Sequence, residues 1–329
     1  MHIPDNYLSP QTCGVLLTAM APIWIVSLKK VKTQIAEKKE TIPLVGICAA
    51  LAFLVMMFNV PIPGGTTAHA VGGTILAILI GPWAACLALS VTLFIQAFLF
   101  GDGGILAFGA NAFNMAFLMP FIGYGIFKLG SQLKHPKIGA FVGSYVGINV
   151  AALMAGIELG IQPLIAHNSA GQPLYAPYGL AITIPAMLFA HLVVAGWIES
   201  LLTLFIYNFV AKNAPQELYD QHQQGSLLKN FWIYLFSGLA LLSPLGLLAS
   251  GDAFGEWDNQ TLLHQLQASH ISQHLPSGMA KGFHFSALFS DYSIKGLPLP
   301  VGYVLAAVTA IIVILLLTKA WSGAHERLS

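Results

Sequence analysis

The chain has 329 residues, of which 56% are hydrophobic and only 8% are charged, and its formal net charge is +1. About a quarter of the residues of a soluble domain are charged, so this composition excludes a soluble globule and requires burial in lipid. The near-neutral charge also argues against a nucleic-acid partner. The three cysteines, which lie in or beside apolar runs without a framework spacing, are predicted to be small core residues: Cys13, Cys48 and Cys86.

The chain begins Met1-His2, and no Lys or Arg precedes Gln11. A signal peptide needs a basic start, so we expect this N-terminus to be retained. It then offers three successive nitrogens, namely the α-amine, the backbone nitrogen of His2 and the His2 imidazole. A planar nitrogen set suits Ni(II), Cu(II) or low-spin Co(II) better than Zn, Ca or Mg, and a fourth nitrogen would complete the square. For an arbitrary protein, a solvated terminal histidine is the commoner alternative.

Crossing a hydrocarbon core of ~30 Å takes about 20 apolar residues. By this criterion the predicted spans are Thr12 to Leu28, Pro43 to Val60, Gly104 to Leu129, Ile138 to Leu164, Leu180 to Val210, Phe231 to Ala249 and Val301 to Leu317. The run from Ala70 to Phe100 is ambiguous, because Gly81-Pro82 divides it into either one kinked span or two short ones.

Cationic residues favour two passes for this run. The cluster Lys29, Lys30, Lys32, Lys38 and Lys39 should be cytoplasmic, which places the N-terminus outside. With two passes, most other cationic residues also fall inside, namely Lys128, Lys134, Lys137, Lys212, Lys229, Lys319 and Arg327, and only Lys281 and Lys295 fall outside. The prediction is an all-α polytopic membrane protein with about nine transmembrane helices and a cytoplasmic C-terminus. Its short third span requires surrounding protein rather than lipid.

The polar stretch from Asn213 to Leu228 is interpreted as a cytoplasmic linker. The predicted organisation is therefore a seven-span domain at 1–212, a linker at 213–229, and a two-span region at 230–329 that encloses an external loop at 251–297.

This topology places His69 on the same side as His2. His69 ends the loop "NVPIPGGTTAHA", in which Pro61, Pro63, Gly64 and Gly65 predict a tight and rigid turn. A rigid turn can hold an imidazole against a docked N-terminus. Considered without Met1-His2, His69 is interpreted as a polar residue at the start of a span. The presence of Met1-His2 on the same side favours its interpretation as a metal ligand.

Three segments, "MHIPDNYLS", "NVPIPGGTTAHAVGGTILAILIGPWAA" and "QAFLFGDGGILAFGANAFNMAF", resemble the signature segments of the CbiM/NikM family, the substrate-binding membrane components of energy-coupling-factor uptake systems for cobalt and nickel. Two later segments, "ALLSPLGLLASGDAFGEW" and "LFSDYSIKGL", resemble the C-terminal region of long members, similar to the separate NikN or CbiN partner. The similarity covers nearly the whole chain.

The resemblance implies four metal ligands, namely the Met1 amine, the backbone nitrogen of His2, the imidazole of His2, and His69. It also implies a location in the lipid bilayer of a prokaryotic cell membrane, two protein partners, namely a transmembrane coupling protein and an ATPase, and no catalytic cofactor. The sequence has no GxxxxGK[ST] motif for ATP phosphates, which agrees with a separate ATPase. It departs from the family at Asn6, where Gly is usual, and at Thr67-Ala68, where Ser-Gly is common. Asn tolerates positive φ, so the ligand set should be unchanged.

The roles of the other polar residues stay open. Asp102, Asn111 and Asn114 are supports for the N-terminal plug on the family interpretation, or otherwise turn residues and polar contacts between spans. Asp5 is a candidate acceptor that orients His2. Glu158, His191 and Glu199 lie within predicted spans, where we slightly favour buried hydrogen bonding over a role in the metal path.

The external loop carries Asp252, Glu256, Asp258 and four histidines, His264, His270, His274 and His284. If "TLLHQLQASHISQHL" is helical, His270 and His274 share a face suited to transient metal capture, although solvated histidines are commoner. Two other functions are weighed against metal uptake, a membrane metalloenzyme using His69, His191 and Glu199, and a stand-alone metal channel. HExxH is absent, and the sequence does not distinguish nickel from cobalt.

Overall fold

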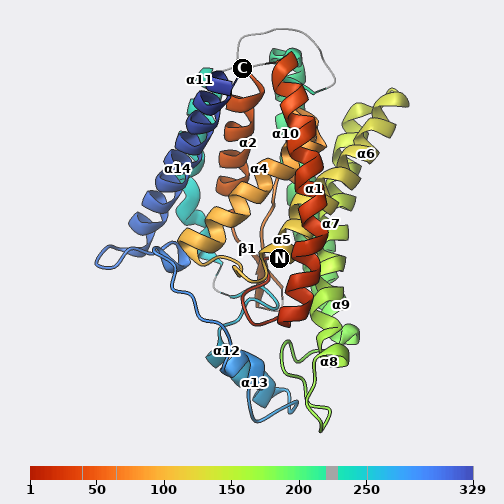
Figure 1. The fold of residues 1–329 in the computed structure, drawn as a ribbon, viewed down its shortest axis with the longest axis vertical. Helices are drawn as coiled ribbons and strands as arrows, with labels where there is room; N and C mark the ends of the chain where they lie inside the picture. The colour runs from red at the N-terminus through yellow and green to blue at the C-terminus, as the bar shows by residue number, and fades with distance from the viewer. Residues whose placement is uncertain (39, 64, 220–228, 250, 329) are drawn as a thin grey trace.

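Long helices run side by side along one axis in the computed structural model, which describes residues 1–38, 40–63, 65–219, 229–249 and 251–328 (Figure 1). The first part of the chain forms α1 (Pro10–Glu37), α2 (Thr41–Met56), β1 (Val60–Ile62), β2 (Thr66–Ala68), α3 (Gly73–Ile80), α4 (Pro82–Ile95), η1 (Gln96–Phe100), α5 (Phe108–Asn111), η2 (Ala112–Leu118) and α6 (Met119–Gln132). The middle forms α7 (Pro136–Gly160), α8 (Gln162–Ile165), α9 (Leu180–Ala190), η3 (His191–Ala195), α10 (Gly196–Asn213) and η4 (Pro215–Glu217). The last part forms α11 (Lys229–Leu242), η5 (Ser243–Leu248), α12 (Asn259–Ala268), α13 (Ser277–Ala280), η6 (Ser290–Tyr292) and α14 (Leu299–Leu328).

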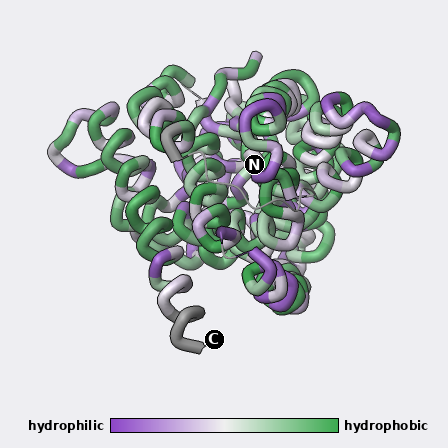
Figure 2. Tube along the Cα trace, turned by 90° about the horizontal axis from the view of Figure 1, so that it is seen from above, coloured by the Kyte–Doolittle hydropathy of each residue, from purple (hydrophilic) through white to green (hydrophobic). Residues whose placement is uncertain are grey.

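Helices occupy all the predicted spans. Among the described residues, 7 helical segments are long and apolar enough to cross a membrane. Two shorter helices, α2 with 16 residues and α3 with 8 residues, account for the remaining two. The tube in Figure 2 is hydrophobic along most of these helices. The predicted all-helical, polytopic membrane fold is therefore confirmed.

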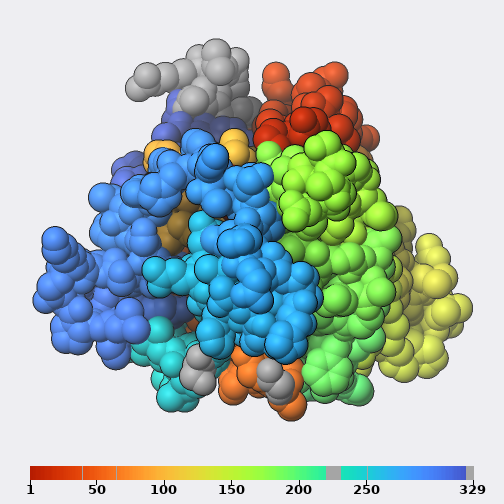
Figure 3. All heavy atoms as spheres, turned by 90° about the horizontal axis from the view of Figure 1, so that it is seen from below, coloured from red at the N-terminus to blue at the C-terminus, as the bar shows by residue number. Residues whose placement is uncertain are grey.

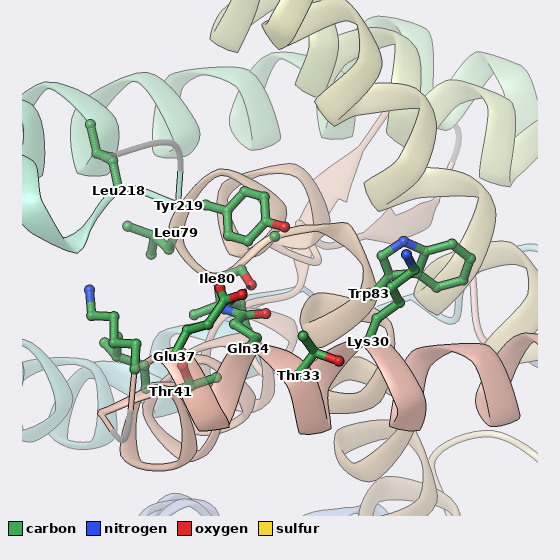
Figure 4. A pocket seen from close by; sticks show the side chains of 13 residues that line it. Lys30, Thr33, Gln34, Glu37, Thr41, Leu79, Ile80, Trp83, Leu218 and Tyr219 are labelled. Carbon is green, nitrogen blue, oxygen red and sulfur yellow. Dashed lines mark hydrogen bonds between the residues drawn. The ribbon is translucent and has the colours of Figure 1, made fainter. Parts of the chain in front are cut away.

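The chain reverses direction at Gly81, so the run from Ala70 to Phe100 forms two helical segments, α3 and α4, rather than one kinked span. Gly81 has φ 84°, in the region that favours glycine, and Pro82 begins α4. Gly81 lines a cavity of about 570 Å³ together with Lys30 and Tyr219 (Figure 4). His69 and the end of α4 both lie at the opposite end of the bundle, next to His2.

The short helix α3 is surrounded by protein. All eight of its residues are buried, against α2, α4, α6 and α7. By contrast, only 17% of the apolar window of α1 is buried, so most of α1 faces outward. The prediction that the third span needs protein neighbours is confirmed, because a helix this short cannot cross lipid alone.

The helix α1 extends further than predicted. The apolar run ends at Leu28, but the helix continues to Glu37, so Lys29, Lys30 and Lys32 lie on its last turns rather than in a loop. The residues after Leu28 include Lys, Gln, Ala and Glu, which all favour helix, so the helix continues beyond the end of the apolar run. The three predicted core cysteines are buried and free.

A two-stranded antiparallel hairpin forms the predicted tight turn before His69. Val60 pairs with Ala68 and Ile62 with Thr66, and Gly65 has φ 82° in the connection. Gly64 lies outside the described residues. The hairpin delivers His69 to the end of the bundle that holds the N-terminus.

The last two long helices, α11 and α14, both pack against α2. The segment between them, residues 251–297, crosses the end of the bundle next to the N-terminus, and its blue spheres cover the middle of that face in Figure 3. After α10, the backbone N–H of Tyr219 donates to the carbonyl of Ile78 in α3 (3.1 Å). Residues 220–228 of the expected linker lie outside the described residues.

Candidate metal centre

Two buried imidazoles face each other at the N-terminal end of the bundle. The Nδ1 atom of His2 is 3.3 Å from the Nε2 atom of His69, and their ring centroids are 5.0 Å apart. His2 is 3% exposed and His69 is 5% exposed. The structure thus brings together the two side chains that the sequence singled out, from positions 67 residues apart.

The other nitrogen of each ring fixes its tautomer. His69 Nδ1 donates to the carbonyl of Ala70 at 3.0 Å, and a carbonyl can only accept. His2 Nε2 donates to Gln96 Oε1 at 3.3 Å, while the Gln96 amide NH₂ donates to Asp102 Oδ2 at 3.4 Å. Burial, then the nearby Met1 amine and His2, lower the pKa of His69 well below its usual value. His2 Nδ1 and His69 Nε2, the ring nitrogens that these two hydrogen bonds leave free, face each other.

A third acceptor completes this contact. Asp102 Oδ1 is 3.3 Å from His2 Nδ1, and the hydroxyl of Tyr292 donates to Asp102 Oδ2. Burial and then the Asp102 charge raise the pKa of Tyr292 well above its usual value, so this hydroxyl stays protonated. Asp102 therefore places a carboxylate oxygen beside the ring of His2, next to the contact between the two imidazoles.

The amine of Met1 is held by a carboxylate of the 251–297 segment. It donates to Glu256 Oε1 at 2.5 Å, and the two groups form an ion pair. The Met1 side chain is 0% exposed, and it packs into the hydrophobic core. The methionine side chain therefore anchors the N-terminus, whereas its amine faces polar groups.

A side-chain amide clamps the residue that follows His2. The backbone N–H of Ile3 donates to Asn111 Oδ1 at 2.8 Å, and Asn111 Nδ2 donates back to the Ile3 carbonyl at 3.0 Å. Asn111 thus supports the N-terminal segment, as the family interpretation suggested. Asn114 does not, because its amide donates to Glu158 Oε2 at 2.8 Å.

The expectation that Asp5 orients His2 is wrong. Asp5 Oδ1 instead accepts the backbone N–H of Leu106 at 2.7 Å. Aspartate side chains readily accept backbone N–H groups of nearby loops. Asp5 therefore stabilises the loop at Leu106 rather than the ring of His2. Gln96 and Asp102 contact His2 in its place.

The 251–297 segment is fastened to the N-terminal loop. Asn6 has φ 68°, the conformation that asparagine tolerates, and its side chain forms two hydrogen bonds with the backbone of Phe283 (2.7 and 2.8 Å). The hydroxyl of Tyr7 donates to the carbonyl of Trp257 at 2.7 Å. Together with the Met1–Glu256 ion pair, these contacts hold the segment over the paired imidazoles.

An acidic cavity leads to the imidazoles. Its volume is about 560 Å³, and His2 and His69 line it together with Asp102, Asp252, Glu256, Asp258 and Asp291. Burial and then the neighbouring carboxylates raise the pKa of Asp252 and Asp291. Crowded carboxylates attract cations, so this cavity favours entry of a positively charged ion.

The buried polar residues of the spans do not form a catalytic group. His191 Nδ1 donates to the carbonyl of Met187 at 2.7 Å, and Glu199 accepts backbone N–H groups of Val71 and Gly72. Within the described residues, no group of three or more His, Cys, Asp or Glu side chains is arranged to hold a metal ion. The metalloenzyme alternative of His69, His191 and Glu199 has no support here.

The histidines of the 251–297 segment are exposed: His264, His270, His274 and His284. The predicted shared face of His270 and His274 is wrong, because α12 ends at Ala268 and His270 has φ 55°. A left-handed residue directly after a helix stops it.

The sequence analysis missed three contacts in the site. Gln96 contacts His2, Tyr292 contacts Asp102, and Glu256 pairs with the Met1 amine. A glutamine within the apolar run "VTLFIQAFLF" is the one local signal, since a polar amide at that depth needs a partner. Glu256 and Tyr292 reach the site from the C-terminal region of the chain. They lie in the two later segments that resemble the family, but the resemblance does not indicate that they contact Met1 or Asp102.

The approach of Gly104 to the N-terminal segment gives a testable prediction. A Cβ atom at Gly104 would lie 2.4 Å from Asp5 Oδ1, 2.5 Å from the Asp5 nitrogen and 2.8 Å from the Pro4 carbonyl carbon. The Gly104→Ala chain should therefore displace the segment that carries His2, at a cost of about 1–3 kcal/mol, and weaken metal binding by about 10- to 100-fold. Equilibrium dialysis of the purified protein would measure this.

Gly179→Ala is the matched control, because Gly179 is also a non-helical glycine, with φ −79° and no atom within 4 Å of its added Cβ. It should bind metal as the wild type does. Equal affinities of the two variants would contradict the prediction.

Comparison with known proteins identifies the chain in two parts. Residues 2–217 match the family described as the cobalt uptake substrate-specific transmembrane region, CbiM, and residues 229–324 match the PDGLE domain. A probable fused nickel transport protein, LarMN, of Lactiplantibacillus plantarum is 63% identical over 97% of both chains. The fused nickel transport protein NikMN of Rhodobacter capsulatus is 41% identical over 95% of both chains.

Two solved structures are also similar. A crystal structure of a transition metal transporter is 52% identical, with a TM-score of 0.62, and covers 71% of this chain and 99% of its own. A truncated transition metal transporter is 56% identical, with a TM-score of 0.61, and covers 64% of this chain and 99% of its own. The chain therefore belongs to the CbiM family of substrate-specific transmembrane uptake components, here joined to a PDGLE domain, and is a transport protein rather than an enzyme.

Proposed function

We propose that this protein takes up Ni²⁺ or Co²⁺ and binds the ion through the Met1 amine, the backbone nitrogen and Nδ1 of His2, and Nε2 of His69. One observation carries the proposal: His2 Nδ1 and His69 Nε2 face each other, while the other nitrogen of each ring is hydrogen-bonded to Gln96 or Ala70. Nitrogen ligands lie about 2.0–2.1 Å from a divalent metal, so neighbouring nitrogens of a square site are about 2.9 Å apart. The separation of 3.3 Å between His2 Nδ1 and His69 Nε2 needs only a small contraction.

Binding at this site requires the Met1 amine to leave Glu256, with which it is paired. The amine and the His2 backbone nitrogen must also lose protons to become ligands, so each bound ion releases protons. The incoming ion replaces the positive charge that Glu256 loses, and the carboxylates of the cavity remain close to it. The exchange therefore keeps charge compensated.

Ni²⁺ and Co²⁺ are both retained as substrates. Two fused relatives are named as nickel transport proteins, whereas the family description and a relative from Clostridium tetani, named cobalt transport protein CbiM, refer to cobalt. Planar nitrogen sites accept either ion.

We further propose that energy comes from a coupling protein and an ATPase in a complex of the energy-coupling-factor type, in a prokaryotic cell membrane. The absence of a phosphate-binding GxxxxGK[ST] sequence supports a separate ATPase. The lysines of α1 lie at the end of the bundle away from the imidazoles, which supports a metal site open to the outside. In this proposal residues 1–212 bind the metal, 213–229 are a linker, and 230–329 assist assembly or metal loading.

A titration of the purified full chain tests the metal preference. We expect one Ni²⁺ or Co²⁺ per chain with high affinity, and weaker binding of Zn²⁺ and Mg²⁺, because those ions do not favour a planar nitrogen set. Isothermal titration with all four ions measures it. Binding that is tightest for Mg²⁺ would refute the proposed site.

Reconstitution in vesicles distinguishes an ATP-dependent uptake component from a stand-alone metal channel. Vesicles that contain this chain alone should take up no Ni²⁺, and uptake should begin when the coupling protein, the ATPase and ATP are added. ATP-independent uptake by the chain alone would favour the channel instead.

A further inference from the structure

Glu199 is a fully buried carboxyl group whose role the transport function does not by itself explain. It lies in the first turn of α10 and is 0% exposed. Its Oε2 atom accepts the backbone N–H of Val71 at 2.8 Å and that of Gly72 at 2.9 Å. Its Oε1 atom has no hydrogen-bond partner among the described residues. The whole of its observed hydrogen bonding is thus directed at two consecutive peptide groups.

These two peptide groups lie at the N-terminus of the short helix α3. Gly72 is the residue before the helix, with φ 80°, and as a glycine it has no side chain that could cap the helix. The first N–H groups of a helix lack intrahelical acceptors, and a carboxylate there is favoured by the helix dipole. Glu199, although on another helix, supplies that acceptor. A buried carboxylate is tolerated when N–H groups compensate it in this way.

The same hydrogen bonds connect Glu199 to His69. The peptide group between residues 70 and 71 contains both the Val71 N–H, which donates to Glu199, and the Ala70 carbonyl, which accepts from His69 Nδ1 at 3.0 Å. One planar peptide therefore separates the carboxylate from the imidazole. Hydrogen bonds in such a chain polarise one another, so the carboxylate makes the Ala70 carbonyl a better acceptor.

We propose that Glu199 is a positioning residue for metal binding. Through the intervening peptide group, it orients His69 and makes the Nε2 atom of His69 a stronger metal ligand. Metal-bound histidines commonly donate their second N–H to a carboxylate or a carbonyl, which fixes the ring and makes it a better ligand. Here the carbonyl is the direct acceptor and the carboxylate stands behind it. This inference rests on the proposed metal site.

Glu199→Gln tests the proposal, because it preserves size and one acceptor oxygen but removes the charge. We expect Ni²⁺ binding about 10-fold weaker, within the range for a lost supporting contact. We also expect the visible ligand-field band of bound Ni²⁺ to move to longer wavelength, toward that of His69→Ala, because the fourth nitrogen is bound more weakly. A purely structural cap would change the thermal stability without moving this band.

Glu158→Gln is the matched control. Glu158 is also buried within a long helix, it accepts one side-chain hydrogen bond from Asn114 through Oε2, and its Oε1 likewise has no partner among the described residues. Both substitutions therefore place a new NH₂ group at an unpartnered buried position. Glu158→Gln should keep the wild-type affinity and band.

Glu199→Asp serves if the Gln variant does not fold. Its carboxylate is one methylene shorter and cannot reach both N–H groups in place, so severalfold weaker Ni²⁺ binding is expected. Wild-type affinity and band position in a folded Glu199 variant would overturn the inference while leaving the metal site intact. If His69→Ala itself binds Ni²⁺ as the wild type does, the proposed metal site fails instead.

Discussion

A chain extended by one residue ahead of Met1 is expected to lose stoichiometric Ni²⁺ or Co²⁺ binding while it still inserts and folds. The extension converts the Met1 amine into a secondary amide, which is not a basic ligand, and moves the new amine by up to ~3.6 Å. Met1 is buried and its amine is paired with Glu256, so an added residue also removes this ion pair. The loss should exceed the roughly 10- to 100-fold cost of a missing supporting contact, because a ligand itself is removed.

Isothermal titration of the purified extended chain measures this loss, with size-exclusion behaviour and thermal stability as the check on folding. The matched control adds the same residue after Ser329, at the other end of the chain. It should bind metal normally. Retained stoichiometric binding in the N-terminally extended chain would exclude the amine as a ligand.

The sequence predicted those features that depend on local pattern. The break at Gly81-Pro82 follows from backbone chemistry, and the rigid hairpin before His69 follows from its prolines and Gly65. The pairing of His2 with His69 could be predicted because the distribution of lysines placed both at one end of the bundle.

The supporting contacts could not be predicted, because they join residues far apart in the chain. Glu256 contacts Met1 across 255 positions, and Glu199 contacts Val71 across 128. Residue type alone indicates that a buried carboxyl needs partners, but not which peptide group supplies them. Asp5 shows the converse error, since proximity in sequence to His2 suggested a contact that the backbone N–H of Leu106 takes instead.

The His69→Ala chain is expected to retain its fold but to lose high-affinity Ni²⁺ binding. The three nitrogens at Met1 and His2 remain, so weak binding should persist, with the ligand-field band shifted to longer wavelength because a weaker ligand takes the fourth position. Removal of the ring also leaves the Ala70 carbonyl without its donor, a cost of about 1–3 kcal/mol that the thermal stability would report. Ni²⁺ titration followed by visible absorption measures affinity and ligand set together.

Imidazole rescue separates a lost ligand from a distorted site. The missing ring leaves a buried hole lined by the Ala70 carbonyl and facing His2 Nδ1, so added imidazole can occupy it and supply the fourth nitrogen. We expect it to restore the band in His69→Ala. It should not do so in His2→Ala, where the fused chelate rings are broken. His264→Ala, which removes an exposed histidine of α12, should match the wild type throughout. Wild-type affinity in His69→Ala would show that the metal is bound elsewhere, whereas lost affinity without rescue would point to a distorted loop rather than a missing ligand.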